Sequence, residues 1–460
     1  MIAIKIKKYQ LVIFLARYLL YLLTNKVEGG EMMDIVLLLK QHVGAPCQSI
    51  VEAGQKVQKG ELIAKPNGLG ANLHSSVYGV VKAVNETAII IEADENQPDE
   101  FVKIKDTNTH IEAIQEAGIV GSGGAGFPTH VKLNVNLEGG YVIANGAECE
   151  PVLGHNIKLM EEDPQVIIRG LKYVKEITNA SKAYIAMKAK HKKALRILKT
   201  ACELEPDIEV KILPDMYPAG DERAIVRDIL GVLLEPGQLP KAANAVIQNV
   251  ETLKHIVNAI ELRKPYITKD ITVAGRVMDA TDGKVFMDVP VGESVKKYID
   301  LCGGYMNPHG EIVMGGPFTG RHVEEDAPIT KTTGGILVAM PFVHDERKVG
   351  LLACECGAQE DRLREIAKEM GAEVVAVEKC KRMVEVDGRY RCDNPGICPG
   401  QAEKVISMKK KGIQILLTGT CGDWTNTVMG VAPRLGVPTY HSTDHVLRAA
   451  GQRLVRRTDK

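Results

Sequence analysis

Apolar runs alternate regularly with amphipathic segments between residues 347 and 460. Four short apolar runs, VGLLAC, AEVVAV, IQILLTGT and VPTYHS, are each followed by a stretch with apolar residues at helical spacing. The second of these helices comes only after an irregular piece that contains RCDNPGICPG. Strands that alternate with helices over short connections are typical of a parallel sheet with right-handed crossovers. The pattern therefore predicts a parallel doubly wound α/β domain over 347–460.

The preceding part of the chain predicts three further units. Short β-runs broken by glycine fill 33–105 and are similar to the barrel-sandwich fold, most simply as a cap over the next domain. Helical and strand patterns alternate over 109–260, which is typical of α/β architecture. More β-runs with one helix over 268–345 predict a β-grasp-like module. We therefore expect a multidomain chain that combines α/β and α+β units.

The first 32 residues differ from the rest of the chain. MIAIKIKK is basic, and the apolar run LVIFLARYLLYLL is interrupted by Arg17. This run is too short and too charged to predict an integral membrane span, and no small-residue cleavage site of a signal peptide follows it. We predict that 1–32 is an extension upstream of the true start and that translation begins at Met32 or Met33. A membrane-surface anchor is the alternative.

Composition and charge narrow the class of protein. Of 460 residues, 45% are hydrophobic and 25% charged, which are the proportions of an ordinary globular chain. The 58 Lys and Arg residues balance the 58 Asp and Glu residues, and only 4% of residues are aromatic. Nucleic-acid binding needs a basic surface or stacking aromatics, so we expect no nucleic-acid partner.

Six of the ten cysteines lie in the last quarter of the chain. In a reducing cytoplasm, where we expect this protein, such a group indicates redox chemistry or metal binding more than structural disulfides. The carboxyl ends of parallel strands open onto one crevice, so cysteines that follow different strands should meet there. Cys421 also precedes a predicted helix, whose N-terminus should lower the pKa of this thiol. The candidate catalytic thiols at the predicted strand ends are Cys354, Cys356, Cys380 and Cys421.

Three interpretations of this group remain open. The favoured one is a thiol/disulfide relay. The second is an iron–sulfur or zinc site, although C-x-C with C-x5-C is not a standard ligand spacing. The third is a set of buried, inert thiols, which is the simplest interpretation of Cys47, Cys202 and Cys302. The candidate metal ligands of the second interpretation are Cys354, Cys356, Cys392 and Cys398.

A run of small residues, GSGGAG, occupies 121–126. Gly121, Gly123 and Gly126 match G-x-G-x-x-G, but a predicted helix precedes them, whereas a dinucleotide-binding loop follows a strand. The backbone amides of such a loop can still approach a phosphate closely. Pro128 suits the first turn of a following helix, and Lys132 would bring a positive charge one turn later.

These residues carry a resemblance. GSGGAGFPTHVKL, NGAECEP, YPAGDERA and QNVETL, in this order, resemble the flavin-binding domain shared by the NADH-oxidising subunit of respiratory complex I and the C subunit of Rnf complexes. DAPITKTTGGILV is similar to the end of the β-grasp (SLBB) module of Rnf C subunits. The resemblance implies FMN as cofactor and NADH as electron donor, with Glu150 and Phe127 as weaker candidates for nicotinamide contacts. The cofactor-binding residues that it implies are Gly121, Gly123, Gly126, Lys132, Asn145, Glu148, Gly220, Asp221, Glu222, Asn249 and Thr252.

The chain departs from this pattern in places. Ala147, Cys149 and Gln248 replace residues of the complex I pattern, and the iron–sulfur motif C-x-x-C-x-x-C-x-x-x-C-P of Rnf C subunits does not occur. The architecture resembles the PrdC family of electron-transfer proteins associated with clostridial D-proline reductase. This resemblance implies transfer of electrons from NADH through FMN and C-terminal thiols to a reductase, with D-proline reductase subunits as partners. The alternatives are a subunit of Rnf-like or cobalamin-reductase type with an iron–sulfur site, and a non-catalytic adaptor that docks a reductase.

Overall fold

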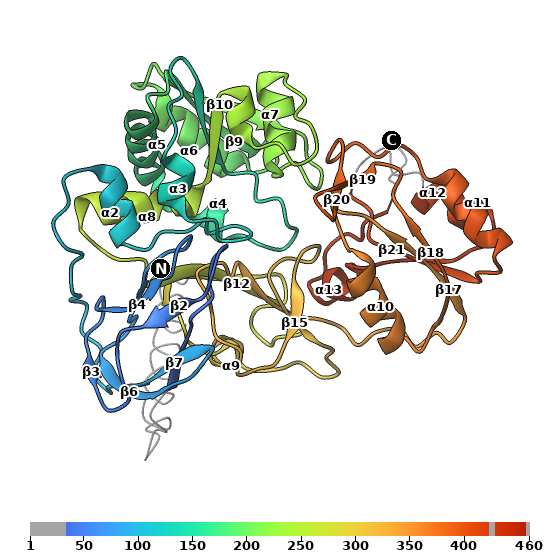
Figure 1. Ribbon diagram of the computed structural model, residues 1–460. Helices are drawn as coiled ribbons and strands as arrows, with labels where there is room; N and C mark the ends of the chain where they lie inside the picture. The colour runs from blue at the N-terminus through green and yellow to red at the C-terminus, as the bar shows by residue number, and fades with distance from the viewer. Residues whose placement is uncertain (1–33, 423–427, 457–460) are drawn as a thin grey trace, which may run out of the picture.

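A computed structural model of the chain describes residues 34–422 and 428–456. The predicted upstream extension, 1–32, lies outside these residues. Figure 1 shows a blue N-terminal unit below a green one, a yellow unit beside them, and an orange-to-red C-terminal unit on the far side of the yellow one. Their sheets confirm the predicted combination of α/β and α+β architecture.

The N-terminal unit is a sandwich of two small antiparallel sheets. Along β1, Ile35 and Leu37 are fully buried while their neighbours are more exposed, which is the alternation expected of a strand with one face on a core. One sheet has the order β1 (Asp34–Leu38), β7 (Ala88–Ala93), β6 (Gly79–Val84), β3 (Lys56–Val57), and the other β2 (Cys47–Ser49), β4 (Leu62–Pro66), β5 (Leu73–His74).

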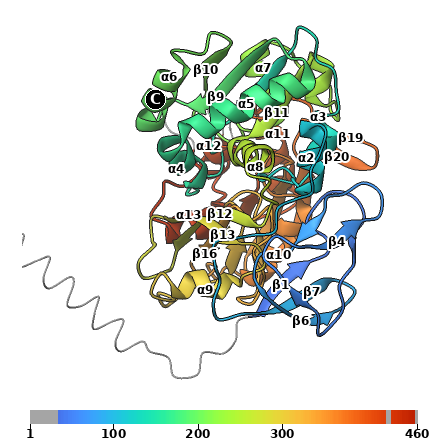
Figure 2. The same ribbon diagram turned by 90° about the vertical axis from the view of Figure 1, so that its left-hand side faces the viewer.

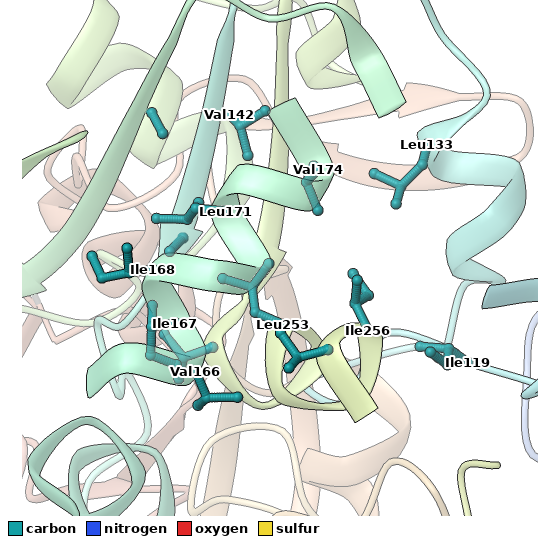
Figure 3. Packing of buried hydrophobic residues seen from close by; sticks show 14 of the residues in the cluster. Ile119, Leu133, Val142, Val166, Ile167, Ile168, Leu171, Val174, Leu253 and Ile256 are labelled. Atoms are coloured by element: carbon teal, nitrogen blue, oxygen red, sulfur yellow. The ribbon is translucent and has the colours of Figure 1, made fainter. Parts of the chain in front are cut away.

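The second unit contains a four-stranded, all-parallel sheet. Apolar residues alternate between its faces, since Val142 packs with the helices of one face and Ile143 with α7 on the other. Figure 3 shows the first of these cores, in which α5 and α8 pack together, and Figure 2 shows α5 lying across the sheet. The strand order is β10 (Ile208–Leu213), β9 (Lys182–Lys188), β8 (Tyr141–Asn145), β11 (Ala245–Asn249). The helices are α2 (His110–Glu116), α3 (Thr129–Leu133), α4 (His155–Glu162), α5 (Pro164–Thr178), α6 (Lys192–Cys202), α7 (Glu222–Leu230), the 3₁₀ turn η1 (Pro240–Ala243) and α8 (Val250–Glu261).

The third unit is a mixed five-stranded sheet with one helix, α9 (Val295–Asp300), which confirms the predicted β-grasp-like module. Ser294 caps the start of α9, where its hydroxyl accepts a hydrogen bond from the backbone of Lys297. The strand order is β13 (Lys284–Pro290), β12 (Thr268–Gly275), β16 (Gly335–Val338), β14 (Ile312–Met314), β15 (Arg321–Val323).

The C-terminal unit contains the predicted parallel sheet, with helices on both faces. Leu351 faces the core built with α10, and the next residue, Leu352, faces the core built with α11 and α12. Part of the segment interpreted as irregular instead forms a hairpin, β19 (Met383–Val386) with β20 (Arg389–Cys392), whose turn is made by Asp387 and Gly388 at positive φ. The strand order is β18 (Glu373–Lys379), β17 (Lys348–Ala353), β21 (Ile415–Thr418), β22 (Thr439–His441), and the helices are α10 (Glu360–Glu369), α11 (Ala402–Lys410), α12 (Val428–Arg434) and α13 (Asp444–Ala449).

Candidate functional site

A cavity of about 750 Å³ lies at the carboxyl edge of the second unit's sheet. Strand β8 is the point where the strand order reverses, because β9 lies on one side of it and β11 on the other. Asn145 and Asn249, the last residues of β8 and β11, are directly paired, and both line the cavity. Ligands of open α/β sheets bind at such a reversal point, so the fold itself indicates a binding site here.

The glycine-rich loop forms one wall of this cavity through Ser122, Gly123, Gly124 and Ala125. The loop is fixed from behind, since the backbone of Ser122 donates to Thr252 Oγ1 at 3.0 Å and its hydroxyl bonds to Tyr266. A Cβ at Gly123 would come within 3.0 Å of the Asn249 side chain. Because Gly123 and Gly124 have no side chains, a ligand can lie directly against the loop backbone there.

Two helices begin at the cavity, and each is capped by a residue that lines it. Asn249 accepts a hydrogen bond from the backbone of Glu251 at the start of α8. Asp221 accepts two from the first turn of α7, although burial raises the pKa of its carboxyl. Helix N-termini favour anions, so the cavity suits a ligand with a phosphate group.

The loop after β8 contributes the acidic groups of the site. Glu148 has a positive φ of 35°, and burial raises its pKa from 4.5 to about 7, against a hydrogen bond from the Asn156 backbone. The Glu150 carboxylate accepts hydrogen bonds from the backbone of Phe318 and of Thr319 in the third unit. The two carboxyls thus differ in role, because Glu150 is tied to the neighbouring unit.

Not every residue implied by the resemblance reaches the cavity. Lys132 Nζ bonds Glu222 Oε1 at 2.5 Å, so the lysine supports a lining carboxylate and does not itself line the cavity. Thr252 holds the backbone of Ser122 from behind, as described above. Gly121 pairs with the backbone of Phe127 behind the loop, and a Cβ at Gly126 would meet the backbone of residue 41. The implied residues that line the cavity are Gly123, Asn145, Glu148, Gly220, Asp221, Glu222 and Asn249.

The arrangement fits FMN. The volume lies within the range of ligand pockets, about 300 to 1,000 Å³, and the wall offers bare backbone and two helix N-termini for a phosphate. Asn145 is held in place, because its amide donates to Gly220 O at 2.9 Å and its Oδ1 accepts from Ala147 N. Gly220 needs to be glycine, since a Cβ there would lie 2.8 Å from the Cβ of Cys149.

The six cysteines of the C-terminal unit form one buried cluster, which we call the cysteine cluster: Cys354, Cys356, Cys380, Cys392, Cys398 and Cys421. Cys354 and Cys356 follow β17 and Cys380 follows β18, as the strand pattern predicts. Cys392, at the end of the unpredicted hairpin, and Cys398, in the loop after it, complete the cluster. Their exposure is only 2 to 8%, and no cysteine of the described chain forms a disulfide.

Contacts within the cluster set the thiol pKa values. A hydrogen bond with Cys398, together with burial, raises the pKa of Cys421 well above its ordinary value. The prediction of a lowered pKa at Cys421 is therefore wrong, because the hydrogen bond with Cys398 and the desolvation of the thiol both raise this pKa. The predicted helix begins within 423–427, which lie outside the described residues. Cys380 has the opposite shift, since a hydrogen bond from Cys354 lowers its pKa, and Gln401 Nε2 also donates to its sulfur at 2.7 Å.

The cysteine cluster meets the cavity at one point. Cys356 belongs to the cluster and also lines the cavity, together with its neighbour Glu355 and with Pro395. Glu355 accepts hydrogen bonds from the backbone of Cys392 and from Arg391. One wall of the cavity is thus made by the segments that carry the cluster.

Within residues 34–422 and 428–456, no group of three or more His, Cys, Asp or Glu side chains is arranged to hold a metal ion. The quartet Cys354, Cys356, Cys392 and Cys398 stays a prediction. None of the helices in the same residues is long and apolar enough to cross a membrane.

Sequence patterns did not identify every lining residue. Tyr217 lines the cavity and stacks on Phe318 with ring centroids 3.6 Å apart. Asn156 and His155 enter from the start of α4, which has no distinctive motif. Glu355 could have been found by its position between two clustered cysteines.

Comparisons with known proteins agree with this geometry. Residues 27–106 match the RnfC barrel sandwich hybrid domain, and residues 114–258 match the Nuo51 FMN-binding domain. The C subunit of the proton-translocating ferredoxin:NAD(+) oxidoreductase complex of Clostridium ljungdahlii is 32% identical over 358 residues, which are 73% of this chain and 77% of that protein. The chain belongs to the RnfC family.

Two further proteins are similar over about half of the chain. The cobalamin reductase PduS of Salmonella typhimurium is 38% identical over 235 residues, about half of each chain. A solved NAD+-reducing [NiFe]-hydrogenase is similar over 49% of this chain and 46% of its own, at 20% identity and a TM-score of 0.42. The two domain matches and the clostridial relative make the chain a member of the RnfC family with an FMN-binding domain of the Nuo51 type.

Proposed function

We propose that this chain is a cytoplasmic electron-transfer flavoprotein that takes electrons from NADH onto FMN in the cavity and passes them through the cysteine cluster to a reductase. The observation that carries the proposal is the shared wall, because Cys356 lies both in the cavity and in the cluster. Electrons that arrive in the cavity would have a redox-active group within the same wall. FMN, when bound, supplies the chemistry that accepts a hydride and releases its two electrons.

The residues of the cavity would bind and orient this cofactor. The bare backbone at Gly123 and the N-terminus of α8 would hold its phosphate, and Asn145, fixed by Gly220, would face its ring or ribityl chain. Glu148, with a pKa of about 7, can hold a proton at the wall under physiological conditions. The helix caps Asn249 and Asp221, together with the loop after β14 in the third unit, would exclude water from the reacting region.

The relay step balances as a two-electron interconversion of two thiols and one disulfide. Two thiols of the cluster lose two electrons and two protons and form one S–S bond when the acceptor is reduced. NADH supplies two electrons and one proton as a hydride, and one further proton comes from water, so that the two thiols form again. The thiols of Cys356 and Cys392 are hydrogen-bonded neighbours, so they are close enough to form the S–S bond.

The acceptor that we propose is a D-proline reductase or a similar reductase. The resemblance to PrdC-type proteins supports this choice, as does the place of the cysteine unit where Rnf C subunits have their iron–sulfur motifs. The relatives described above have other acceptors or complexes in their names. One is a subunit of a ferredoxin:NAD(+) oxidoreductase complex, and the other is a cobalamin reductase.

A second candidate function is an Rnf-like or cobalamin-reductase subunit with an iron–sulfur cluster. The gathering of Cys354, Cys356, Cys392 and Cys398 in one buried cluster favours this candidate. It differs from the relay in a measurable way, because a cluster adds iron, acid-labile sulfide and broad visible absorption. A third, the non-catalytic adaptor, would lack bound flavin.

The test is reduction by NADH followed by counting of thiols. Oxidised, FMN-loaded protein is mixed with NADH without oxygen, quenched in acid, denatured and alkylated, and the alkylated cysteines are counted by mass spectrometry. We expect flavin bleaching followed by two new thiols in the cluster. Cys356→Ser should keep the bleaching and lose the two new thiols, whereas the control Cys202→Ser, outside the cluster, should behave as wild type. Bleaching with no new thiol in wild type would contradict the relay.

A further inference from the structure

Helix α7 connects the flavin cavity to the cysteine cluster. Its first residues, Asp221 as cap and Glu222, line the cavity. Arg223 and Arg227 are four residues apart, so they lie on one face of the helix. Both reach into the C-terminal unit, at the loop that follows strand β20.

The two arginines bind this loop through its backbone and one amide. Arg223 Nη1 donates to Cys392 O at 2.7 Å. Arg227 Nη1 donates to Asn394 Oδ1 and to Pro395 O, each at 2.6 Å. These bonds join residues 167 to 169 positions apart in the chain and cross from one unit to another.

The geometry makes these contacts more than surface ion pairs. The Arg223 side chain is 11% exposed and that of Arg227 17%, and Asp228 fixes the Arg227 guanidinium from its other side at 2.7 Å. A planar guanidinium offers several donors in a fixed orientation, so it can hold a loop in one position. Hydrogen bonds to charged groups are also stronger than neutral ones.

The bound loop carries parts of both redox elements. Cys392, whose carbonyl Arg223 binds, belongs to the cysteine cluster, and Cys398, two residues beyond the loop, belongs to it as well. Pro395, whose carbonyl Arg227 binds, lines the flavin cavity. The loop also packs on the second unit, where a Cβ at Gly396 would lie 2.3 Å from the end of Met216. Movement of this loop would therefore separate the cluster from the cavity.

We propose that Arg223 and Arg227 are positioning residues that hold the 392–396 loop against the second unit and so set the rate of electron transfer from the flavin to the cluster thiols. This inference rests on the proposed function. Neither arginine lines the cavity, so we expect reduction of the flavin by NADH to proceed without them. A displacement of about 1 Å between reacting groups can cost about a hundredfold in rate, so we expect loss of the arginine contacts to slow the second step.

The experiment separates the two electron-transfer steps in the full-length, FMN-loaded protein. Stopped-flow absorbance follows flavin bleaching by NADH, and acid quench with alkylation follows the appearance of cluster thiols. We expect Arg227→Met to bleach at the wild-type rate and to form thiols about tenfold or more slowly. Arg227→Lys, which keeps the positive charge but loses the planar guanidinium, should give an intermediate rate. The control Arg169→Met breaks an ion pair to Glu261 inside the second unit and should change neither step.

Two further measurements keep the result interpretable. Dithiothreitol should reduce the cluster of Arg227→Met as fast as that of wild type, because the thiols themselves are unchanged. Asn394→Ala, which removes one of the two acceptors of Arg227 on the loop, should slow the same step, and its effect should not add fully to that of Arg227→Met. Thiol formation at the wild-type rate in Arg227→Met would overturn the inference. Absence of bleaching or of thiol formation in wild type would instead overturn the proposed function.

Discussion

Replacement of Glu148 by glutamine should change how stability depends on pH. Burial raises the pKa of this carboxyl from 4.5 to about 7 in the folded protein. The unfolded chain releases the proton near the ordinary value, so the folded state binds more protons between these two values. The free energy of unfolding therefore falls as pH rises from about 4.5 through 7.

The size of this effect follows from the two pKa values. Each tenfold change in proton affinity is worth about 1.4 kcal/mol, so wild type should lose about 3 kcal/mol from this group between pH 4.5 and pH 8. Glu148→Gln, which is neutral at every pH, should not show this loss. For a unit of this size, 3 kcal/mol corresponds to a difference of roughly 6 to 12 °C in Tm.

The assay is thermal unfolding of flavin-free wild type and Glu148→Gln across pH 5 to 8. The Tm of wild type should fall from pH 5 to pH 8 by more than the Tm of Glu148→Gln. The difference between the two proteins should therefore change steadily across this window. Glu203→Gln, an exposed carboxylate at the end of α6, serves as matched control and should run parallel to wild type. Parallel curves for wild type and Glu148→Gln would refute the assignment of a half-buried carboxyl with a raised pKa to this wall.

Three further predictions concern burial and close packing. Lys331 is fully buried, its amino group donates hydrogen bonds to two backbone carbonyls, and burial lowers its pKa to about 7. The free energy of unfolding should therefore rise by roughly 4 kcal/mol from pH 7 to pH 10.5. In denaturant titrations, Lys331→Met should flatten this rise. Gly220→Ala should lower the ratio of bound flavin to protein, read from the absorption spectrum, because its Cβ would meet Cys149; Gly154→Ala, whose Cβ has room, should leave the ratio unchanged. The cysteine cluster should resist iodoacetamide in the reduced native protein and react fully in urea, as peptide mass spectrometry would show; rapid native labelling of all six thiols would contradict their burial.

The sequence predicted the order of elements well because hydrophobic periodicity reports burial directly. The alternation of apolar runs and amphipathic stretches after residue 347 corresponds to β17, α10, β18 and the elements that follow. The hairpin β19–β20 was missed because few of its side chains are buried, although its Asp387–Gly388 turn is a sequence signal of a two-residue hairpin.

The convergence of cysteines could be predicted in part. The rule that parallel strands end at one edge places Cys354, Cys380 and Cys421 together from the strand pattern alone. The same rule could not place Cys392, which depends on the hairpin, nor show that Cys356 reaches the flavin cavity. Contacts between separate units depend on tertiary packing, which local sequence patterns do not encode.

The positions of charged residues were the least predictable. Lys132 follows the glycine loop at a spacing that suits a phosphate contact, yet it pairs with Glu222, ninety residues later. The thiol pKa at Cys421 likewise depends on Cys398, which is distant in sequence. Partner choice between such groups is decided by the assembled site.

The most direct test of the account is the visible absorption spectrum of the oxygen-free purified protein before and after NADH, with cluster thiols counted in the same samples. The account predicts flavin bands that bleach with NADH, followed by two new thiols among the six of the cysteine cluster. A protein that stays colourless after incubation with FMN, or that bleaches without any new thiol, would contradict the shared path from cavity to cluster.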